Sequence, residues 1–231
     1  MCGATDQATP VYTLINATPS PYGRKNAIAM YEKGISFQVR WEKPWEPTTI
    51  IGDYSPLQQL PVLLHGTSEK VAAYDSTYIL DYLELMHPET SLLPTNVEGK
   101  ALEKKLQMLG ERLMEVTAII FFESQRPTET QSDAWLTRQR LKIKTGLAEI
   151  AALIGDRAPT LQDTITLGDI AVGTTLNMFE FDAIGMPISP EFEFRRAQPN
   201  LGTYFDALQA RPSFTKTMLV MFDTDLSKTV G

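Results

Sequence analysis

Clustered and alternating apolar positions divide the first part of the chain into strands and a helix. The β-branched run at 11–15 predicts a buried strand, and the alternation from Ile35 to Trp41 predicts a strand with one buried face. Between them, Ser20-Pro21 supplies a preferred N-cap and a favoured first-turn proline for a helix that ends near Gly34. A strand, a helix and a strand in this order form a βαβ unit, right-handed by the usual rule.

Two further strands follow a proline. Pro61 stands at the first residue of an apolar run that ends at Leu64, where its missing N–H least disturbs a strand ladder. A polar turn at 65–70 then leads to a second strand at 71–74, so the pattern predicts a hairpin. A helix follows from Asp75-Ser76 and breaks at His87-Pro88.

The end of this hairpin predicts a ligand site. The backbone of Leu60, before the proline, is free to pair with an extended ligand instead of a neighbouring strand. Asp75-Ser76 begin a helix, and a helix N-terminus presents unpaired N–H groups and partial positive charge that can hold an anion. Together these features indicate a site for a small peptide that carries a carboxylate.

Helical periodicity dominates the remainder. Apolar residues recur at spacings of three and four over 97–124 and over 132–154, which predicts two long helices. Thr166-Leu167-Gly168-Asp169 is a capping-box pattern that predicts the start of a buried helix running from Ile170 to about Phe181. A further helix is expected from Leu201 to Ala210. These apolar stripes are interpreted first as core packing, and the capping box as structural.

Composition narrows the classes of protein. The chain has 231 residues and a net charge of −7, without a basic run, which argues against a nucleic-acid partner. Its longest apolar runs fall short of the roughly 18 residues of a membrane helix. One cysteine, Cys2, and two histidines, His65 and His87, predict neither an intramolecular disulfide nor a dedicated metal centre. The polar N-terminus lacks a signal-peptide pattern, so a reduced, cytoplasmic location is expected.

These motifs, in this order, resemble the cytosolic glutathione S-transferases from Val11 to about Leu219. Ser20-Pro21-Tyr22-Gly23 stands where thioredoxins and glutaredoxins carry a Cys-Pro-Tyr-Cys type motif. The resemblance implies an α/β N-terminal thioredoxin-like domain at 9–87, with a mixed four-stranded sheet, a linker at 88–97 and an all-α helical domain at 98–224. It also implies a homodimer and glutathione as co-substrate, with no metal.

The resemblance assigns roles to individual residues. Ser20 is the expected catalytic residue, since its hydroxyl can donate a hydrogen bond to the glutathione thiolate at a helix N-terminus. Gln59 would reach the glycine end of glutathione, and Leu60, before Pro61, would pair with the cysteinyl backbone. Asp75, shorter than the Glu more usual in the family, would bind the γ-glutamyl ammonium, and Ser76 the carboxylate.

Other interpretations of the same residues stay open. Ser20 can be a helix cap without a further role. Tyr12 and Tyr22 compete for thiol activation but rank below Ser20, and Arg24 is interpreted as surface charge rather than an anion ligand. The resemblance also suggests residues that line a second-substrate pocket, although core packing is an alternative for them: Tyr22, Trp45, Ile119, Phe121 and Phe122.

Three functions follow from this interpretation. The first is thiolate attack on an electrophilic carbon of a small apolar substrate, by a glutathione S-transferase. The second is a related glutathione-dependent ether cleavage, dehalogenation, isomerisation or peroxide reduction at the same site. The third is a non-catalytic protein that binds glutathione in a regulatory role. A glutaredoxin-like mixed-disulfide enzyme is discounted, because position 20 has no thiol.

Overall fold

The structure, a computed structural model, describes residues 10–44, 46–124, 126–180 and 192–220. Its N-terminal part is built on one four-stranded sheet with the strand order β2-β1-β3-β4. β1 pairs in parallel with β2 and antiparallel with β3, which pairs antiparallel with β4. The predicted mixed sheet is therefore confirmed, and its strands are β1 (Tyr12–Asn16), β2 (Phe37–Trp41), β3 (Val62–His65) and β4 (Val71–Tyr74).

The two faces of the sheet are covered differently. Helices α1 (Pro21–Glu32) and α2 (Ser76–Met86) supply apolar side chains to the same cluster as Leu14 and Leu63 of the sheet. On the other face, Ile51 of the short helix η1 (Ile51–Asp53) packs with Ile15 and Val62. The segment between β2 and β3, which has no clear period in the sequence, therefore closes the sheet against solvent.

The second part of the chain is helical, as predicted. Ser132 caps the second long helix, and the buried helix starts three residues before Ile170, at Leu167. The short helices at 194–197 and 212–215 were not predicted. The helices are η2 (Pro88–Thr90), α3 (Val97–Ser124), η3 (Thr128–Thr130), α4 (Asp133–Ile154), α5 (Leu167–Glu180), α6 (Phe194–Ala197), α7 (Pro199–Gln209) and α8 (Pro212–Thr215).

The predicted capping box begins α5. Thr166 Oγ1 accepts a hydrogen bond from the Asp169 amide at 3.1 Å, and Asp169 Oδ2 accepts one from the Thr166 amide at 2.8 Å. Asp169 is also the partner of Arg157 at 2.5 Å and of the Tyr204 hydroxyl at 2.6 Å. The box is thus the centre of a buried polar network that joins α5 to α7.

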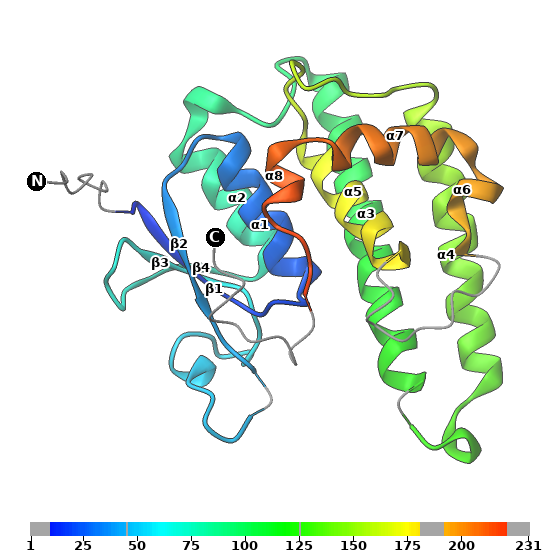
Figure 1. Cartoon of the computed structure of the whole chain (residues 1–231), viewed down its shortest axis with the longest axis horizontal. Coiled ribbons are helices and arrows are strands. Elements are labelled where there is room, and N and C mark those ends of the chain that lie inside the picture. Colours follow the sequence, from blue (N-terminus) through cyan, green and yellow to red (C-terminus); the bar gives the residue numbers. More distant parts are fainter. Residues whose placement is uncertain (1–9, 45, 125, 181–191, 221–231) are drawn as a thin grey trace, which may run out of the picture.

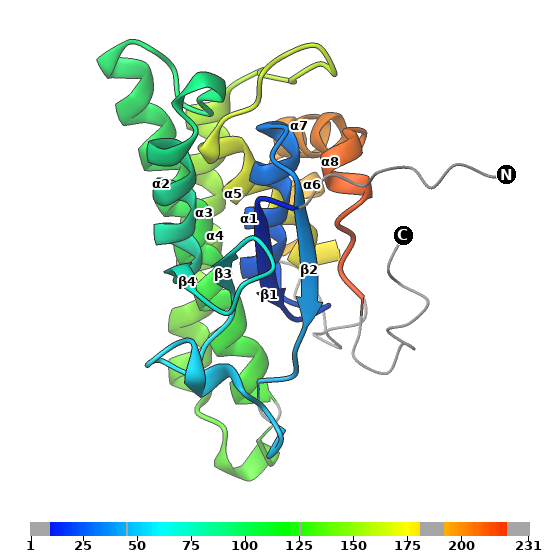
Figure 2. The ribbon, with the colours of Figure 1, turned by 90° about the vertical axis from the view of Figure 1, so that its left-hand side faces the viewer.

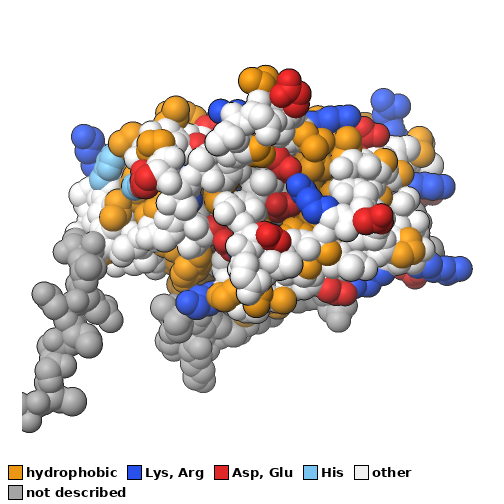
Figure 3. Space-filling model, turned by 90° about the horizontal axis from the view of Figure 1, so that it is seen from above, with side chains coloured by type: hydrophobic (Ala, Val, Ile, Leu, Met, Phe, Trp, Pro, Cys, Tyr) orange, Lys and Arg blue, Asp and Glu red, His pale blue; other side chains and the backbone are white. Residues whose placement is uncertain are grey.

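Helix α1 lies between the sheet and the helical part, where it packs against both α2 and α5 (Figures 1 and 2). Ile28 and Ala29 of α1 and Leu80 of α2 belong to the hydrophobic cluster that fills the helical part. The two parts therefore share a core along α1. Seen from above, acidic and basic side chains are interspersed, and neither sign dominates that face (Figure 3).

Candidate functional site

Ser20 is the N-cap of α1 at the end of the loop that follows β1. Its backbone is extended, and its Oγ accepts a hydrogen bond from the Gly23 amide at 3.3 Å. The hydroxyl proton is not used in that bond, so Ser20 can cap the helix and donate to an anion at the same time. Within the described ranges the Tyr22 amide has no hydrogen-bond partner. The first turn of α1 therefore offers an O–H and an N–H in a region of partial positive charge.

The phenol of Tyr12 is occupied elsewhere. Tyr12 is 3% exposed, and its hydroxyl is hydrogen-bonded to His87 Nε2 at 3.0 Å, at the end of α2. Burial, followed by the neighbouring Tyr82, raises the pKa of Tyr12 to about 12. Because the Tyr12 hydroxyl is already hydrogen-bonded to His87, it is less available to a thiolate than the half-buried Ser20 hydroxyl.

The peptide bond between Leu60 and Pro61 is cis. Pro61 is buried directly before β3, while Leu60 is half-buried outside the ladder. The backbone amide and carbonyl of Leu60 have no hydrogen-bond partner among the described residues. Gln59 is exposed beside it. The Leu60 amide can donate a hydrogen bond to the backbone of an extended peptide, and the Leu60 carbonyl can accept one from it.

Asp75 and Ser76 form the turn from β4 into α2. Asp75 adopts a left-handed conformation with φ of 68°, and its Oδ1 accepts hydrogen bonds from the amides of Thr77 and Tyr78 at 2.8 and 3.2 Å. Asp75 is therefore a helix cap whose second carboxylate oxygen is free for an ammonium. Among the described residues, the amide and hydroxyl of Ser76 have no partner. A carboxylate at this helix N-terminus would find two donors.

Tyr22 connects these two helix ends. It is half-buried, and burial, then the charges of Glu115 on α3 and of Asp75, raise the pKa of its phenol to about 12. The Tyr22 phenol therefore lies near Glu115 of α3 and near Asp75 at the start of α2. Farther along α3, Ile119 and Phe122 are 37% and 62% exposed, so core packing does not account for them.

The remaining pocket candidates have different surroundings. Phe121 is half-buried and packs edge-to-face on Phe122, with 5.4 Å between ring centroids. Trp45, which was also predicted for this pocket, lies outside the described residues. The structure thus brings Tyr22 close to the turn at Asp75, and it leaves Ile119 and Phe122 as accessible apolar side chains.

The interpretation of Arg24 as surface charge is wrong. The side chain is 2% exposed, and its Nη1 donates to Asn177 Oδ1 on α5 at 2.6 Å. Its other hydrogen bonds reach Gln209, the Phe214 carbonyl and Thr217. Burial lowers the pKa of Arg24 to about 10. Sequence periodicity missed this position because α1 is buried on the sheet side and on the side of the helical domain.

Two neighbours of Arg24 were missed altogether. Lys25 is 1% exposed and forms an ion pair with Glu111 of α3, and its Nζ also donates to Thr77 Oγ1 of α2 at 3.3 Å. Asn26 is fully buried and donates to the Ser76 carbonyl at 2.8 Å. The sequence signal pointed the other way. A run of three polar residues inside a helix usually marks a solvent-exposed face.

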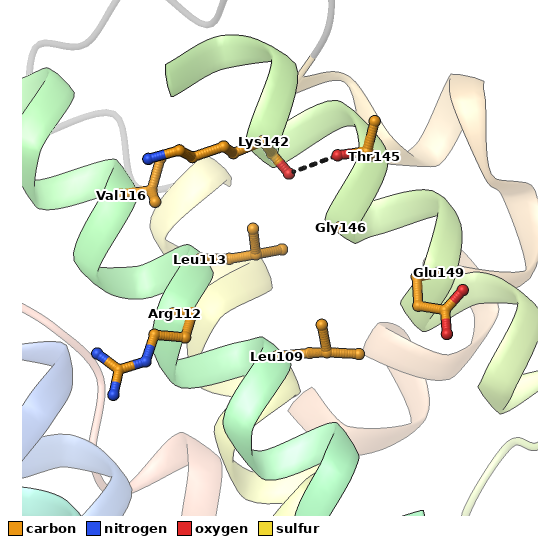
Figure 4. Close-up of a pocket in the computed structure, with 8 residues that line it drawn as sticks. All are labelled: Leu109, Arg112, Leu113, Val116, Lys142, Thr145, Gly146 and Glu149. Atoms are coloured by element: carbon orange, nitrogen blue, oxygen red, sulfur yellow. Dashed lines mark hydrogen bonds between the residues drawn. The ribbon is translucent and has the colours of Figure 1, made fainter. Parts of the chain in front are cut away.

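A cavity of about 380 Å³ lies apart from these residues, between α3 and α4. None of the residues predicted for the site lines it. In Figure 4, Arg112 points away from the other lining side chains. The lining residues are Leu109, Arg112, Leu113, Val116, Lys142, Thr145, Gly146 and Glu149.

Two kinds of feature are absent from the described residues. Within the described ranges, no group of three or more His, Cys, Asp and Glu side chains is arranged to hold a metal ion. In the same part of the chain, no helix combines the length and apolar character needed to cross a membrane.

Comparison with known proteins identifies the family. Residues 14–91 match the family model of the glutathione S-transferase N-terminal domain, and residues 133–207 match that of the C-terminal domain. The uncharacterized GST-like protein YibF of Escherichia coli (strain K12) is 30% identical over 205 residues, which are 88% of this chain and 96% of the relative. The chain belongs to the glutathione S-transferase family.

Solved structures agree in fold. A glutathione S-transferase from Methylobacterium radiotolerans, in complex with glutathione sulfonate, has a TM-score of 0.81 at 42% identity, over 93% of this chain and 98% of that chain. A glutathione S-transferase from Methylobacillus flagellatus, with GSH bound, has a TM-score of 0.79 at 26% identity, over 90% of this chain and 100% of that chain. The thioredoxin-like and helical architecture predicted from the sequence is confirmed.

Proposed function

We propose that this protein is a glutathione transferase that binds glutathione along Leu60, Asp75 and Ser76 and activates its thiol at Ser20. The observation that carries the proposal is the Ser20 hydroxyl at the N-terminus of α1, which accepts from the Gly23 amide and donates to none of the described residues. A structure at 42% identity that contains glutathione sulfonate supports glutathione as the ligand.

The donors of the site fit the parts of glutathione. The carboxylate of the γ-glutamyl residue accepts hydrogen bonds from the Ser76 amide and hydroxyl. The ammonium of the same residue donates to the second carboxylate oxygen of Asp75. The cysteinyl backbone pairs with Leu60, and Gln59 reaches the glycine end. These contacts bring the sulfur to the first turn of α1, next to Ser20.

Catalysis then depends on the thiol pKa. A free thiol has a pKa near 8.5, so only a few per cent is thiolate at neutral pH. Each unit of lowering needs about 1.4 kcal/mol of preferential stabilisation of the anion. One charge-assisted hydrogen bond and the field of a helix N-terminus supply energies of that order. The thiolate attacks an electrophilic carbon of the second substrate, and the leaving group departs with the bonding electron pair.

The second substrate is proposed to be small and apolar, bound by Tyr22 of α1 and by the exposed Ile119 and Phe122 of α3. The ether-cleaving, dehalogenating, isomerising and peroxide-reducing reactions use the same thiolate and remain alternatives within this proposal. We also propose that the protein is a homodimer, that a linker at 88–97 separates its two domains, and that it is located in the cytoplasm.

The test combines binding with turnover. Calorimetry should show stoichiometric glutathione binding, and an activated aryl halide should give a thioether conjugate at a rate above the uncatalysed one. A panel of β-aryl ethers, haloalkanes, isomerisable cis-enones and hydroperoxides then assigns the reaction. Absence of glutathione binding would contradict the proposal, and binding without turnover of any panel member would favour the regulatory alternative. Light scattering measures the oligomeric state.

A further inference from the structure

Three successive side chains of α1 are polar and buried, and each forms hydrogen bonds to elements outside α1. Arg24, Lys25 and Asn26 are 2%, 1% and 0% exposed. Arg24 reaches α5 and the segment around α8, Lys25 reaches α2 and α3, and Asn26 reaches the first residue of α2. They follow directly after the turn that carries Ser20.

Stability alone does not explain two buried cations at this place. Arg24 and Lys25 lie in the first half of α1, where the helix macrodipole opposes positive charge. Burial lowers the pKa of both groups, which reflects the cost of desolvating them. Apolar residues of similar size often replace buried ions without loss of stability. The burial of these two cations therefore needs an explanation other than stability, and their hydrogen-bond partners provide one.

Arg24 acts on the thiol end of the site. Its amide donates to the Ser20 carbonyl at 3.1 Å and so closes the first turn of α1. Its guanidinium donates to Asn177 of α5 and to the Phe214 carbonyl, and within the described ranges none of its partners is a carboxylate. The helical domain thus fixes the turn that presents Ser20, and behind that turn lies a positive charge that has no carboxylate partner among the described residues.

Lys25 and Asn26 act on the γ-glutamyl end. Asn26 Nδ2 holds the Ser76 carbonyl at 2.8 Å, and Lys25 Nζ holds Thr77 Oγ1 at 3.3 Å. The ion pair of Lys25 with Glu111 ties the same group to α3. These bonds hold the start of α2, where the proposed γ-glutamyl site uses the Ser76 amide and hydroxyl.

We propose that Arg24, Lys25 and Asn26 are positioning residues, and that they hold different ends of the glutathione site in place. Arg24 fixes the thiol end through the helical domain, and Lys25 with Asn26 fix the γ-glutamyl end through α2. This inference rests on the proposed function. It predicts that thiol activation and glutathione affinity can be changed separately from within one helix.

The test compares matched variants of the two ends of α1. Lys33 is a buried cation at the C-terminal end, paired with Glu84 at 2.8 Å, so Lys33→Met is the control for Lys25→Met. Arg211 is buried and paired with Glu32 of α1 at 2.8 Å, so Arg211→Met is the control for Arg24→Met. Each variant is titrated with glutathione by calorimetry, and its bound thiolate is titrated by ultraviolet absorbance.

Lys25→Met and Asn26→Leu are expected to weaken glutathione binding roughly tenfold, the order of one lost hydrogen bond at the site, with the bound thiol pKa unchanged. Arg24→Met is expected to raise the bound thiol pKa by about half a unit to one unit, the effect of a charge on the order of 10 Å away, with little change in affinity. Lys33→Met and Arg211→Met should change neither quantity.

Two milder variants guard against misfolding. Asn177→Ala removes the main partner of Arg24 from α5, and Thr77→Val removes the acceptor of Lys25 on α2. They should shift thiol pKa and affinity, respectively, in the same directions. Variants of both ends that behave like their controls would overturn the inference while the proposed function stands. Wild type that does not bind glutathione would overturn both.

Discussion

The carboxamide of Asn16 lies directly against the α-carbon of Gly23. A Cβ atom at position 23 would fall 1.8 Å from Asn16 Oδ1, in space that the carboxamide already occupies. Asn16 ends β1, and the Gly23 amide donates to Ser20 Oγ, so this contact joins the sheet to the turn that presents Ser20. Position 23 is where dithiol enzymes of this fold carry their second cysteine. Here any side chain would require Asn16 to move.

Gly23→Ala is therefore expected to destabilise the protein by about 1–3 kcal/mol, the usual cost of overpacking, and to raise the bound thiol pKa by moving Ser20. Chemical denaturation and thiolate absorbance measure the two effects. Asn16→Ala opens the space, so adding Gly23→Ala to it should cost little further stability. If Gly23→Ala lost the same free energy of unfolding in wild type and in Asn16→Ala, the close packing of Asn16 against Gly23 would be contradicted.

The two phenols predict an alkaline pH dependence. Burial is the main cause that raises the pKa of Tyr12 and of Tyr22 to about 12, against roughly 10 in an unfolded chain. The folded state resists ionisation of these phenols, so their contribution to stability is complete below pH about 10 and is lost as the pH rises toward about 12.

Denaturation midpoints of wild type should consequently fall more steeply across that window than those of Tyr12→Phe. Below it, Tyr12→Phe should cost about 0.5–1.5 kcal/mol for the hydrogen bond to His87, and the bound thiol pKa should not change. A raised thiol pKa in Tyr12→Phe would transfer the activating role from Ser20 to Tyr12.

The exposed apolar residues of α3 test the second-substrate pocket. Phe122→Ala should raise KM for an apolar electrophile several-fold and leave the Kd for glutathione unchanged, because Phe122 is not among the proposed glutathione contacts. Leu161, 56% exposed in the loop before α5, provides the control variant Leu161→Ala. Steady-state kinetics with each substrate varied in turn separates the two constants. Equal KM values for Phe122→Ala and wild type would remove Phe122 from the pocket.

Asp169 is predicted to matter for folding alone. Its replacement by Ala leaves the buried Tyr204 hydroxyl without its acceptor and removes one of the two carboxylates that pair with Arg157, which should cost about 1–3 kcal/mol. The folded fraction should retain its glutathione affinity, since the capping box lies in the helical domain. Asp163, an exposed acceptor for the Thr160 amide, gives a matched Asp163→Ala variant with a much smaller shift in the denaturation midpoint.

Local chemistry made most of the fold predictable. The N-cap at Ser20, the capping box at Thr166 and the start of a strand at Pro61 depend on neighbours within a few residues. The structure has both caps as expected, and its strand begins one residue after Pro61. The helix limits at 97–124 follow from a periodic core face. The segment between β2 and β3 lacks a period because a short helix covers the sheet there with isolated apolar residues.

Interdomain contacts were not predictable in the same way. Arg24 and Lys25 resemble a solvated helix face, because their partners are distant in sequence, such as Asn177 and Glu111. Only the folded chain shows that α1 is covered on two sides. The roles of Gln59, Asp75 and Ser76 in ligand binding remain predictions of the family resemblance, to which the structure adds the free donors at Ser76.

The titration of bound glutathione in wild type and Ser20→Ala tests the central claim most directly. Ser132→Ala is the control, because Ser132 caps α4 through an equal 3.3 Å bond to the Trp135 amide and lies outside the site. Both variants should lose about 1 kcal/mol of stability as helix caps. Only Ser20→Ala should raise the thiol pKa, by about one unit, at unchanged affinity. An unchanged thiol pKa in Ser20→Ala would contradict the account.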